Sequence, residues 1–318
     1  MADRSIGVLI QAADAAEAVA QIRQAEDAGI EAAWSTMGGA GGGDVMTTFA
    51  AALTATDRIL LGTAIVQTWP RHPIAIAGQV LALEALAPGR FRLGIGPAHE
   101  SAMTGTYGYD FTAPLTNLRE YLTVVCALLH EGEVDFEGRH VTARSSIRAT
   151  VQTPVMASAL RPRSFELCGE LADGAISWMC PRSYLVEQAL PALRRGAQAA
   201  VRQPPPLVAH VPICVTENGG GSDELVREQL GNYGGIPFYQ AMFAQAGFPD
   251  AAERYSDELL GDLVISGSEE EVVSGLLELL EAGMGEVLAA PVLDPGDRER
   301  SIERAFAAVA RACREASG

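Results

Sequence analysis

The chain has 318 residues, of which 48% are hydrophobic and 20% charged, and it carries a formal net charge of −17. This composition supports a large hydrophobic core and excludes a disordered protein. The negative charge disfavours binding to nucleic acid or to an anionic membrane surface, but a small anionic ligand is compatible with a few arginines gathered at one site. At roughly 150 residues per domain the length suggests two domains, although an α/β barrel of this size can form one.

Five cysteines stand at positions 126, 168, 180, 214 and 313, and no two have the short spacing of a metal knuckle or a redox dithiol. We therefore expect reduced cysteines in a cytoplasmic protein. The first apolar run is too short for a signal peptide. Because no apolar stretch approaches the roughly 18 residues of a membrane span, we expect no membrane segment.

Short apolar runs alternate with amphipathic segments along the whole chain. We predict strands at Ser5–Ile10, Ala32–Thr36, Ile59–Val66, Phe91–Ile95, Pro154–Ser158, Ala175–Met179, Leu207–Thr216 and Val287–Val292. We predict helices at Asp14–Ala28, Val45–Ala55, Ile74–Leu86, Leu115–Leu129, Ser164–Ala172, Tyr184–Val201 and Arg300–Arg314. Strands that alternate with helices form parallel βαβ units, and eight such units favour a closed (β/α)8 TIM barrel over an open doubly wound sheet.

Capping signals mark the ends of several of these helices. Asp14, with Glu17 three residues later, is suited to cap the first helix, and Gly29 is suited to end it. Ser268-Glu-Glu-Glu271 has the pattern of a capping box, which opens a further helix that ends at Gly283. These signals support the division of the chain into βα units.

We expect one domain, residues 1–318, with insertions around 97–114, 134–150 and 217–267. The first follows the fourth predicted strand, the second has the pattern of a hairpin, and the third contains helical segments of its own. Long segments that follow strand carboxyl ends usually build the active site of a barrel. The hairpin precedes a strand instead, so we expect it to serve packing.

Several familiar motifs begin but are not completed. Gly94-Ile-Gly96 resembles the start of a dinucleotide fingerprint, but its sixth position is His99. The Gly38–Gly43 run lacks the Lys-Ser/Thr of a P-loop, so we interpret it as a flexible loop. The five histidines form no ligand cluster, and we expect no metal site.

Four motifs occur in order and are more specific: Ile59-Leu-Leu-Gly-Thr-Ala-Ile-Val66, Arg71-His-Pro73, Ala87-Pro-Gly-Arg-Phe-Arg-Leu-Gly-Ile-Gly96 and Leu171-Ala-Asp-Gly-Ala-Ile-Ser-Trp178. Their order and spacing resemble the luciferase-like monooxygenase superfamily, and within it the branch that uses the deazaflavin coenzyme F420. Leu118-Arg-Glu-Tyr-Leu122 and Val134-Asp-Phe-Glu-Gly138 resemble a subgroup of coenzyme-dependent oxidoreductases of unassigned substrate. The resemblance covers nearly the whole chain and implies a TIM barrel with insertions and a homodimer.

The resemblance also implies where the coenzyme ring binds. In the deazaflavin branch the ring packs at the carboxyl-terminal mouth of the barrel, against a bulge in the third strand that contains a non-proline cis peptide. Matching Gly62–Val66 to this motif places the cis bond at Ala64–Ile65; an ordinary buried strand is the alternative. The implied ring contacts are Thr63, Ala64, Ile65, Val66, Gly96 and Pro97.

Phosphate binding in the family comes from backbone amides after the fifth strand, and free N–H groups at a helix N-terminus suit an anion. The matching residues are Ser158, Ala159, Leu160, Arg161, Pro162 and Arg163. The family usually has glycine where this chain has Arg161, whose side chain either crowds the phosphate or pairs with it. In an acidic protein we favour pairing through Arg161 or Arg163.

His99 is the candidate catalytic residue, since related enzymes carry a polar residue near the ring at this point. It is either a proton donor or a structural histidine. For the histidine of Arg71-His72-Pro73 the sequence allows two roles, a catalytic one and a helix-capping one. The residues expected at the substrate pocket are Gln11, Met37, Trp69, Trp178 and Met179, although core packing explains Trp178 equally well.

Together these features predict an F420-dependent oxidoreductase that transfers a hydride between the reduced coenzyme and a small organic substrate with a C=C, C=N or C=O bond. The acid or histidine that many relatives carry after the second strand is replaced by Thr36-Met-Gly-Gly, so reduction of the substrate is the expected direction. The first alternative is an FMN-dependent luciferase-like monooxygenase. The second is a flavin-binding barrel without turnover.

Overall fold

The computed structural model describes residues 5–37, 43–217 and 223–317. Eight parallel strands close into a barrel in the order β1-β2-β3-β5-β8-β9-β10-β12, and β12 pairs with β1 to complete the ring. Their bounds are β1 Ser5–Leu9, β2 Ala32–Ser35, β3 Leu60–Thr63, β5 Phe91–Gly96, β8 Val155–Ser158, β9 Gly174–Ile176, β10 Leu207–Val215 and β12 Glu286–Pro291. The (β/α)8 TIM barrel expected from the sequence is therefore confirmed.

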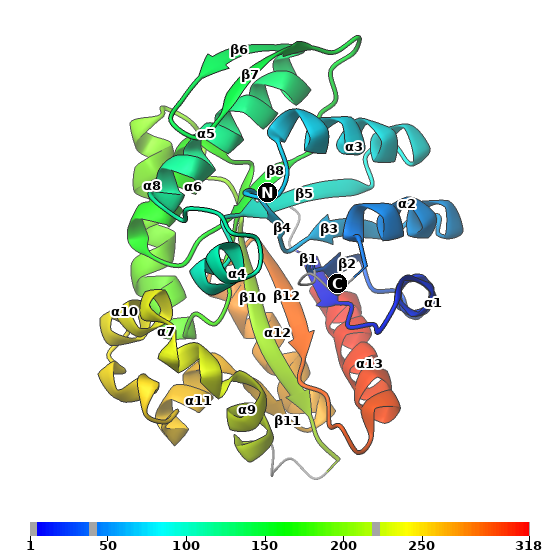
Figure 1. Cartoon of the computed structure of the whole chain (residues 1–318). Helices are drawn as coiled ribbons and strands as arrows, with labels where there is room; N and C mark the ends of the chain where they lie inside the picture. The colour runs from blue at the N-terminus through cyan, green and yellow to red at the C-terminus, as the bar shows by residue number, and fades with distance from the viewer. Residues whose placement is uncertain (1–4, 38–42, 218–222, 318) are drawn as a thin grey trace.

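The helices that follow the strands cover the outside of the barrel (Figure 1). They are α1 Ala15–Ala28, α2 Val45–Ala55, α3 Pro73–Leu86, α5 Pro114–Cys126, α6 Pro162–Leu171, α8 Leu190–Ala199, α12 Glu269–Glu281 and α13 Arg298–Ala316. Apolar side chains between these helices and the strands form the large outer core. The capping predictions are confirmed: Asp14 Oδ1 accepts from the amide of Glu17 at 2.8 Å, and Ser268 and Glu271 form a reciprocal capping box.

Two short strands of the structure were not predicted as separate strands from the sequence. The predicted strand Ile59–Val66 is interrupted after Thr63, and the chain resumes as β4 Val66–Gln67, which pairs with β5. A further strand, β11 Ile265–Gly267, lies in the third insertion and pairs with β10. Strands of two or three residues are too short to show a hydrophobic period, which is why the pattern did not reveal them.

Two predicted helices are less regular than expected. The segment predicted as Leu115–Leu129 is α5 followed by a π-helical turn, η1 Ala127–Glu131. The segment predicted as Tyr184–Val201 consists of α7 Arg182–Tyr184, the π-helical turn η2 Leu185–Ala189 and α8. Wide turns keep the apolar side facing inward, so the hydrophobic pattern does not distinguish them from an α-helix.

The segments predicted as insertions contain elements additional to the eight βα units; residues 218–222 are outside the described residues. Residues 97–114 contain α4 Glu100–Gly105. Residues 134–150 include most of the hairpin of β6 Glu133–Glu137 and β7 Thr142–Ser146. The third insertion supplies α9 Asp223–Leu230, η3 Gly231–Gly235, α10 Pro237–Gln245, η4 Pro249–Ala252 and α11 Asp257–Leu263. The hairpin and helices α9 to α11 lie at opposite ends of the view in Figure 1.

The barrel interior is packed by side chains from several strands, including Trp34, Met156, Ile176, Val208 and Leu288. A Cβ atom at position 62 would lie 2.3 Å from the Trp34 ring, so Gly62 makes the room that this indole occupies. The filled interior blocks the middle of the barrel. Ligands therefore have access at an end of the barrel rather than through it.

Candidate active site

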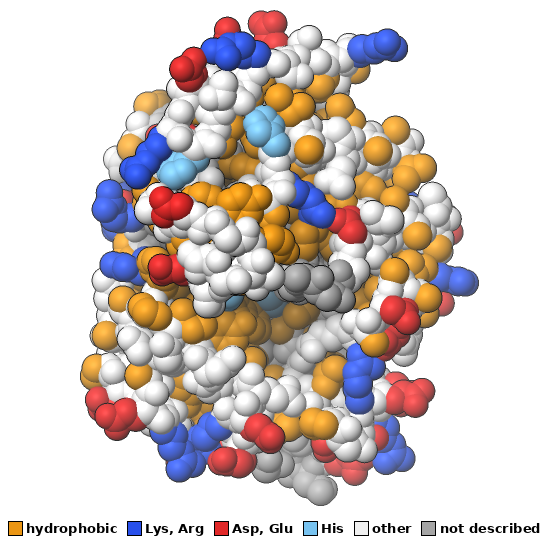
Figure 2. Space-filling model, viewed as in Figure 1, with side chains coloured by type: hydrophobic (Ala, Val, Ile, Leu, Met, Phe, Trp, Pro, Cys, Tyr) orange, Lys and Arg blue, Asp and Glu red, His pale blue; other side chains and the backbone are white. Residues whose placement is uncertain are grey.

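A cavity of about 1180 Å³ opens at the carboxyl-terminal ends of the strands. Residues at or just beyond these ends line it, among them Leu9, Ser35, Ile65, Pro97, Ser158, Ser177, Pro212 and Pro291. In Figure 2 a hollow with hydrophobic side chains on its floor opens in the middle of the face, with most charged side chains around its edge. The volume is slightly above the usual range of small-molecule sites, about 300–1,000 Å³.

The interruption of the third strand forms part of the cavity wall. The peptide bond between Ala64 and Ile65 is cis, as the sequence predicted. The Ala64 amide donates to Ser35 O at 2.9 Å, and Ile65 O accepts from the Met37 amide at 3.2 Å, so β2 holds the bulge in place. Ala64 and Ile65 line the cavity. Val66 is buried behind them.

Thr63 and Gly96 support this wall from behind. The Thr63 hydroxyl donates to Gly94 O and accepts from the Gly94 amide, both at 2.8 Å, which joins β3 to β5. A Cβ atom at position 96 would lie 2.2 Å from Ser158 Oγ and 3.2 Å from Ile65 Cδ1. Neither residue lines the cavity, so their predicted coenzyme contacts are indirect in this geometry.

The predicted phosphate segment reaches the cavity along its full length, from Ser158 to Ser164. The amides of Leu160 and Arg161 both donate to Ser164 Oγ at 3.1 Å, and that hydroxyl donates to Arg161 O at 2.8 Å. Free N–H groups were expected here from the sequence. In the structure both groups are already bonded to Ser164, a serine in the first turn of α6. Arg161 and Arg163 are exposed at the rim.

His99 stands at the start of α4, after Ala98, whose φ of 60° is left-handed. The ring of His99 lines the cavity, and its centre lies 5.8 Å from that of Tyr239 and 6.0 Å from that of Tyr233. Burial lowers the pKa of His99 below its usual value of 6.5, so the neutral ring predominates at pH 7. The side chain forms no helix-capping hydrogen bond.

Three of the five residues predicted for the substrate pocket line the cavity: Gln11, Met37 and Trp178. Trp69 and Met179 do not. Trp69 lies 5.4 Å, between ring centres, from Phe111 and the same distance from His140. Met179 is completely buried in the hydrophobic core and has a left-handed φ of 54°.

The Arg71-His72-Pro73 motif has a structural role in this geometry. His72 Nδ1 accepts from the Ile74 amide at 3.3 Å and caps α3, with Pro73 in its first turn. Arg71 pairs with Asp44, the cap of α2. Neither Arg71 nor His72 lines the cavity, so the helix-capping interpretation is the one the structure supports.

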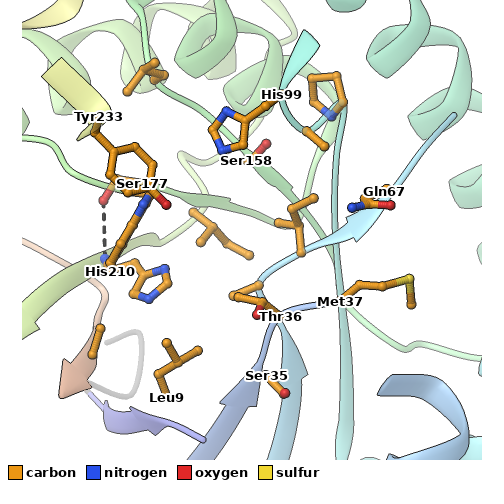
Figure 3. A pocket seen from close by; sticks show the side chains of 18 of the residues that line it. Leu9, Ser35, Thr36, Met37, Gln67, His99, Ser158, Ser177, His210 and Tyr233 are labelled. Carbon is orange, nitrogen blue, oxygen red and sulfur yellow. Dashed lines mark hydrogen bonds between the residues drawn. The ribbon is translucent and has the colours of Figure 1, made fainter. Parts of the chain in front are cut away.

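The sequence analysis missed several polar and aromatic groups that face the cavity. These groups are Ser177, His210, Gln67, Tyr233 and Tyr239. Ser177 and His210 lie within predicted strands, whereas the other three lie in segments for which no strand or helix was predicted. His210 is 4% exposed, and burial lowers its pKa to about 3. The sequence feature that could have indicated His210 is its position as a histidine inside the apolar run Leu207–Val215. In Figure 3, His210 and Tyr233 lie on one side of the cavity and Gln67 on the other.

Within residues 5–37, 43–217 and 223–317, no group of histidine, cysteine, aspartate or glutamate side chains has the arrangement of a metal site. No helix in the same ranges is long and apolar enough to cross a membrane. The five cysteines are all unpaired.

Fold and site together define a TIM-barrel protein with a cofactor-sized cavity at the carboxyl mouth and a bulged third strand. The profile of the luciferase-like monooxygenase family matches residues 3–286. The chain therefore belongs to the luciferase-like monooxygenase family, as its motifs indicated.

Three individual proteins illustrate which members of the family this chain is similar to. A 5,10-methylenetetrahydromethanopterin reductase of Methanopyrus kandleri is 26% identical over an alignment that covers 95% of this chain and 97% of that protein. An F420-dependent glucose-6-phosphate dehydrogenase of Beutenbergia cavernae is 32% identical over 48% of this chain and 47% of that protein. The structure of an F420-dependent secondary alcohol dehydrogenase with an F420–acetone adduct superposes with a TM-score of 0.81 at 19% identity, covering 98% of this chain and 99% of that one.

Proposed function

We propose that the protein is an F420-dependent oxidoreductase that transfers a hydride between the reduced coenzyme and a C=C, C=N or C=O bond of a small organic substrate. The observation that carries the proposal is the cavity itself, which combines a wall at Ala64–Ile65 with an arginine-bearing helix N-terminus. The names of the relatives support it, because two of those compared are F420-dependent oxidoreductases. The absence of an acidic or histidine residue after β2 favours reduction of the substrate.

The residues of the cavity fit a deazaflavin ring. Gln67 lines the cavity, and its Oε1 atom is buried without a hydrogen-bond partner among the described residues. The heteroatom edge of such a ring carries N–H and C=O groups that match a carboxamide. The absence of a side chain at Gly96 lets Ile65 and Ser158 approach each other there. Ile65, Gln67 and Ser158 would hold the ring, and Arg161 or Arg163 its phosphate.

When bound, F420 supplies the hydride chemistry. Ile65 provides an apolar surface that fixes the ring position and leaves its other face to the substrate. Arg161 and Arg163 would pair with the anionic tail at the rim, where charge-assisted bonds are strong. The amides of Leu160 and Arg161, which now donate to Ser164 Oγ, would be the backbone donors for its phosphate. His99, in the protonated form that is the minor one at pH 7, would donate a proton to the reduced substrate.

Turnover tests the proposal. Reduced F420 is incubated with the protein and a panel of enones, imines and ketones, and its oxidation is followed at the visible absorption band of the coenzyme. Substrate-dependent oxidation is the expected result. Retention of FMN on purification, with oxygen-dependent turnover, would favour the monooxygenase alternative. F420 binding without turnover on the whole panel would favour a non-catalytic barrel.

Cytoplasmic location and a homodimer are further parts of the proposal. The unpaired cysteines are consistent with a reducing compartment. The homodimer rests on the family resemblance. Light scattering on the purified protein measures the oligomeric state directly.

A further inference from the structure

A series of aromatic rings forms one wall of the cavity. The ring centres of Trp178 and His210 lie 4.2 Å apart, those of Trp178 and Tyr233 5.9 Å, and those of Tyr233 and Tyr239 5.0 Å. His99 continues the wall at 5.8 Å from Tyr239. Tilted and edge-to-face contacts of this kind hold rings in place. The aromatic wall, defined by these five residues, is therefore a firm, largely apolar surface.

The aromatic wall lies across the cavity from the proposed coenzyme wall. His210 belongs to β10, and in the order of the eight barrel strands β10 lies directly across from β3. The end of β3 leads into Ala64 and Ile65, where the ring is proposed to rest. Figure 3 shows the same separation, with His210 and Tyr233 on the side opposite Gln67. A coenzyme ring against Ile65 thus leaves the aromatic wall to the substrate.

Charge in the cavity is confined to its rim. Of the described residues that line it, only Asp14, Arg161 and Arg163 carry a formal charge. Asp14 is exposed and caps α1, and the two arginines are proposed to bind the coenzyme phosphate. Residues 38–42 and 218–222, which are outside the described ranges, contain no charged side chain. A carboxylate or phosphate on the substrate would lose its hydration here without gaining a cationic partner.

One polar atom in the aromatic wall is available to a ligand. The Nε2 atom of His210 is buried and has no hydrogen-bond partner among the described residues. An unpaired buried polar atom is unfavourable, and a ligand that pairs with it gains binding energy. Because burial keeps the pKa of His210 near 3, its ring is neutral and forms a hydrogen bond without introducing charge.

Building on the proposed function, we propose that the substrate is an uncharged, planar carbonyl compound that lies between the coenzyme ring and the aromatic wall, with His210 donating a hydrogen bond to its oxygen. We infer a planar substrate because the rings of Trp178 and Tyr233 form the surface against which it would lie. The lack of charge follows from the uncharged lining of this part of the cavity. His210 is then a determinant of substrate specificity.

A matched pair of probes tests the substrate class: cyclohex-2-en-1-one and its 4-carboxylate, which differ mainly in charge. Binding is measured on the protein with and without F420 by quenching of tryptophan fluorescence, since Trp178 lies at the site. We expect the enone to bind at least tenfold more tightly than the carboxylate, a difference of about 1.4 kcal/mol. Equal affinities, tighter binding of the carboxylate, or binding of neither probe overturns the proposal. Enone binding by protein that fails to bind F420 would overturn the proposed function alone.

Variants identify the residues responsible. In Tyr233→Arg a cation enters the aromatic wall, so the preference should move toward the carboxylate by about tenfold or more, whereas Tyr233→Phe keeps the preference of the native protein. His210→Phe should weaken enone binding about tenfold, with partial recovery in His210→Gln and F420 affinity within twofold of native. Weaker F420 binding with unchanged enone affinity in His210→Phe would assign His210 to the coenzyme and overturn its proposed role.

Discussion

Arg92 and Glu286 form an ion pair inside the barrel, at the end opposite the cavity. The Nη1 and Nη2 atoms of Arg92 donate to the Glu286 carboxylate at 2.5 and 3.0 Å, and Trp34 Nε1 donates to the same carboxylate at 2.9 Å. The guanidinium carbon lies 4.4 Å from the centre of the Trp34 ring. Arg92 and Glu286 lie at the starts of β5 and β12. The cluster therefore closes the amino-terminal end of the barrel, beneath the apolar side chains of its interior.

Breaking this ion pair should destabilise the fold strongly. Arg92→Met leaves the Glu286 carboxylate, 5% exposed, without its counter-charge, and should lower the free energy of unfolding by about 3–5 kcal/mol. The control is Arg144→Met, which removes ion pairs with Asp135 and Glu137. All three side chains are at least 59% exposed, so the variant should cost less than about 1 kcal/mol. Urea denaturation measures both, and similar small losses would contradict a structural role for the buried pair.

His99 is the second residue whose role is testable. If it donates the proton, His99→Ala should lower kcat by about a hundredfold. Because burial lowers the pKa of His99 below 6.5, the protonated form is lost as pH rises through that lowered value, and kcat should fall with it. The pH dependence should be absent in His99→Asn. A loss below about threefold in kcat would return His99 to a structural role.

At the scale of elements, a glutamate attaches the β6–β7 hairpin to α5. The Glu120 carboxylate accepts hydrogen bonds from the amides of Arg139, His140 and Val141, at 2.7 to 3.0 Å. Burial alone raises the pKa of Glu120, but these three backbone bonds outweigh it and lower the pKa below 4.5. A charged group thus holds the turn between β6 and β7, in addition to the apolar contacts of Val124 with Val141 and Ala143.

Replacing this glutamate should loosen the hairpin in a pH-dependent way. Glu120→Gln should lower the free energy of unfolding at pH 7 by about 1–3 kcal/mol, because the amide group accepts on one oxygen only. The native pKa is lower than the unfolded one, so the contribution of the carboxylate is complete above about 4.5 and is lost as pH falls through the native value. Denaturation at pH 7 and below pH 4 measures the difference, and a penalty independent of pH would contradict it.

The sequence predicted the regular elements better than the site. Asp14, Gly29 and the Ser268–Glu271 box mark helix ends because capping depends on local hydrogen bonds that a short stretch of sequence encodes. His210 faces the cavity from an apolar run that is buried on both sides, where no alternation of polar and apolar residues shows which side chains point inward. Tyr233 reaches the site from an insertion whose position depends on tertiary packing alone.

Under the proposed function, this acidic protein has to attract an anionic coenzyme. The net charge of −17 opposes the approach of a phosphate, and Arg161 and Arg163 at the rim offset it locally. Arg161→Glu should therefore weaken F420 binding by about tenfold or more, whereas Arg144→Glu, on the distant hairpin, should change it little. The loss should shrink at high salt. Equal affinities for native protein and Arg161→Glu would remove Arg161 from the site.

We infer that F420 is the coenzyme of this barrel, and equilibrium titration of the purified protein with F420 and, separately, with FMN tests this claim. Quenching of F420 fluorescence and of flavin fluorescence gives the two dissociation constants. The structure and the relatives lead us to expect saturable F420 binding at least tenfold tighter than FMN binding. Tighter binding of FMN, or no saturable binding of F420, would contradict the claim.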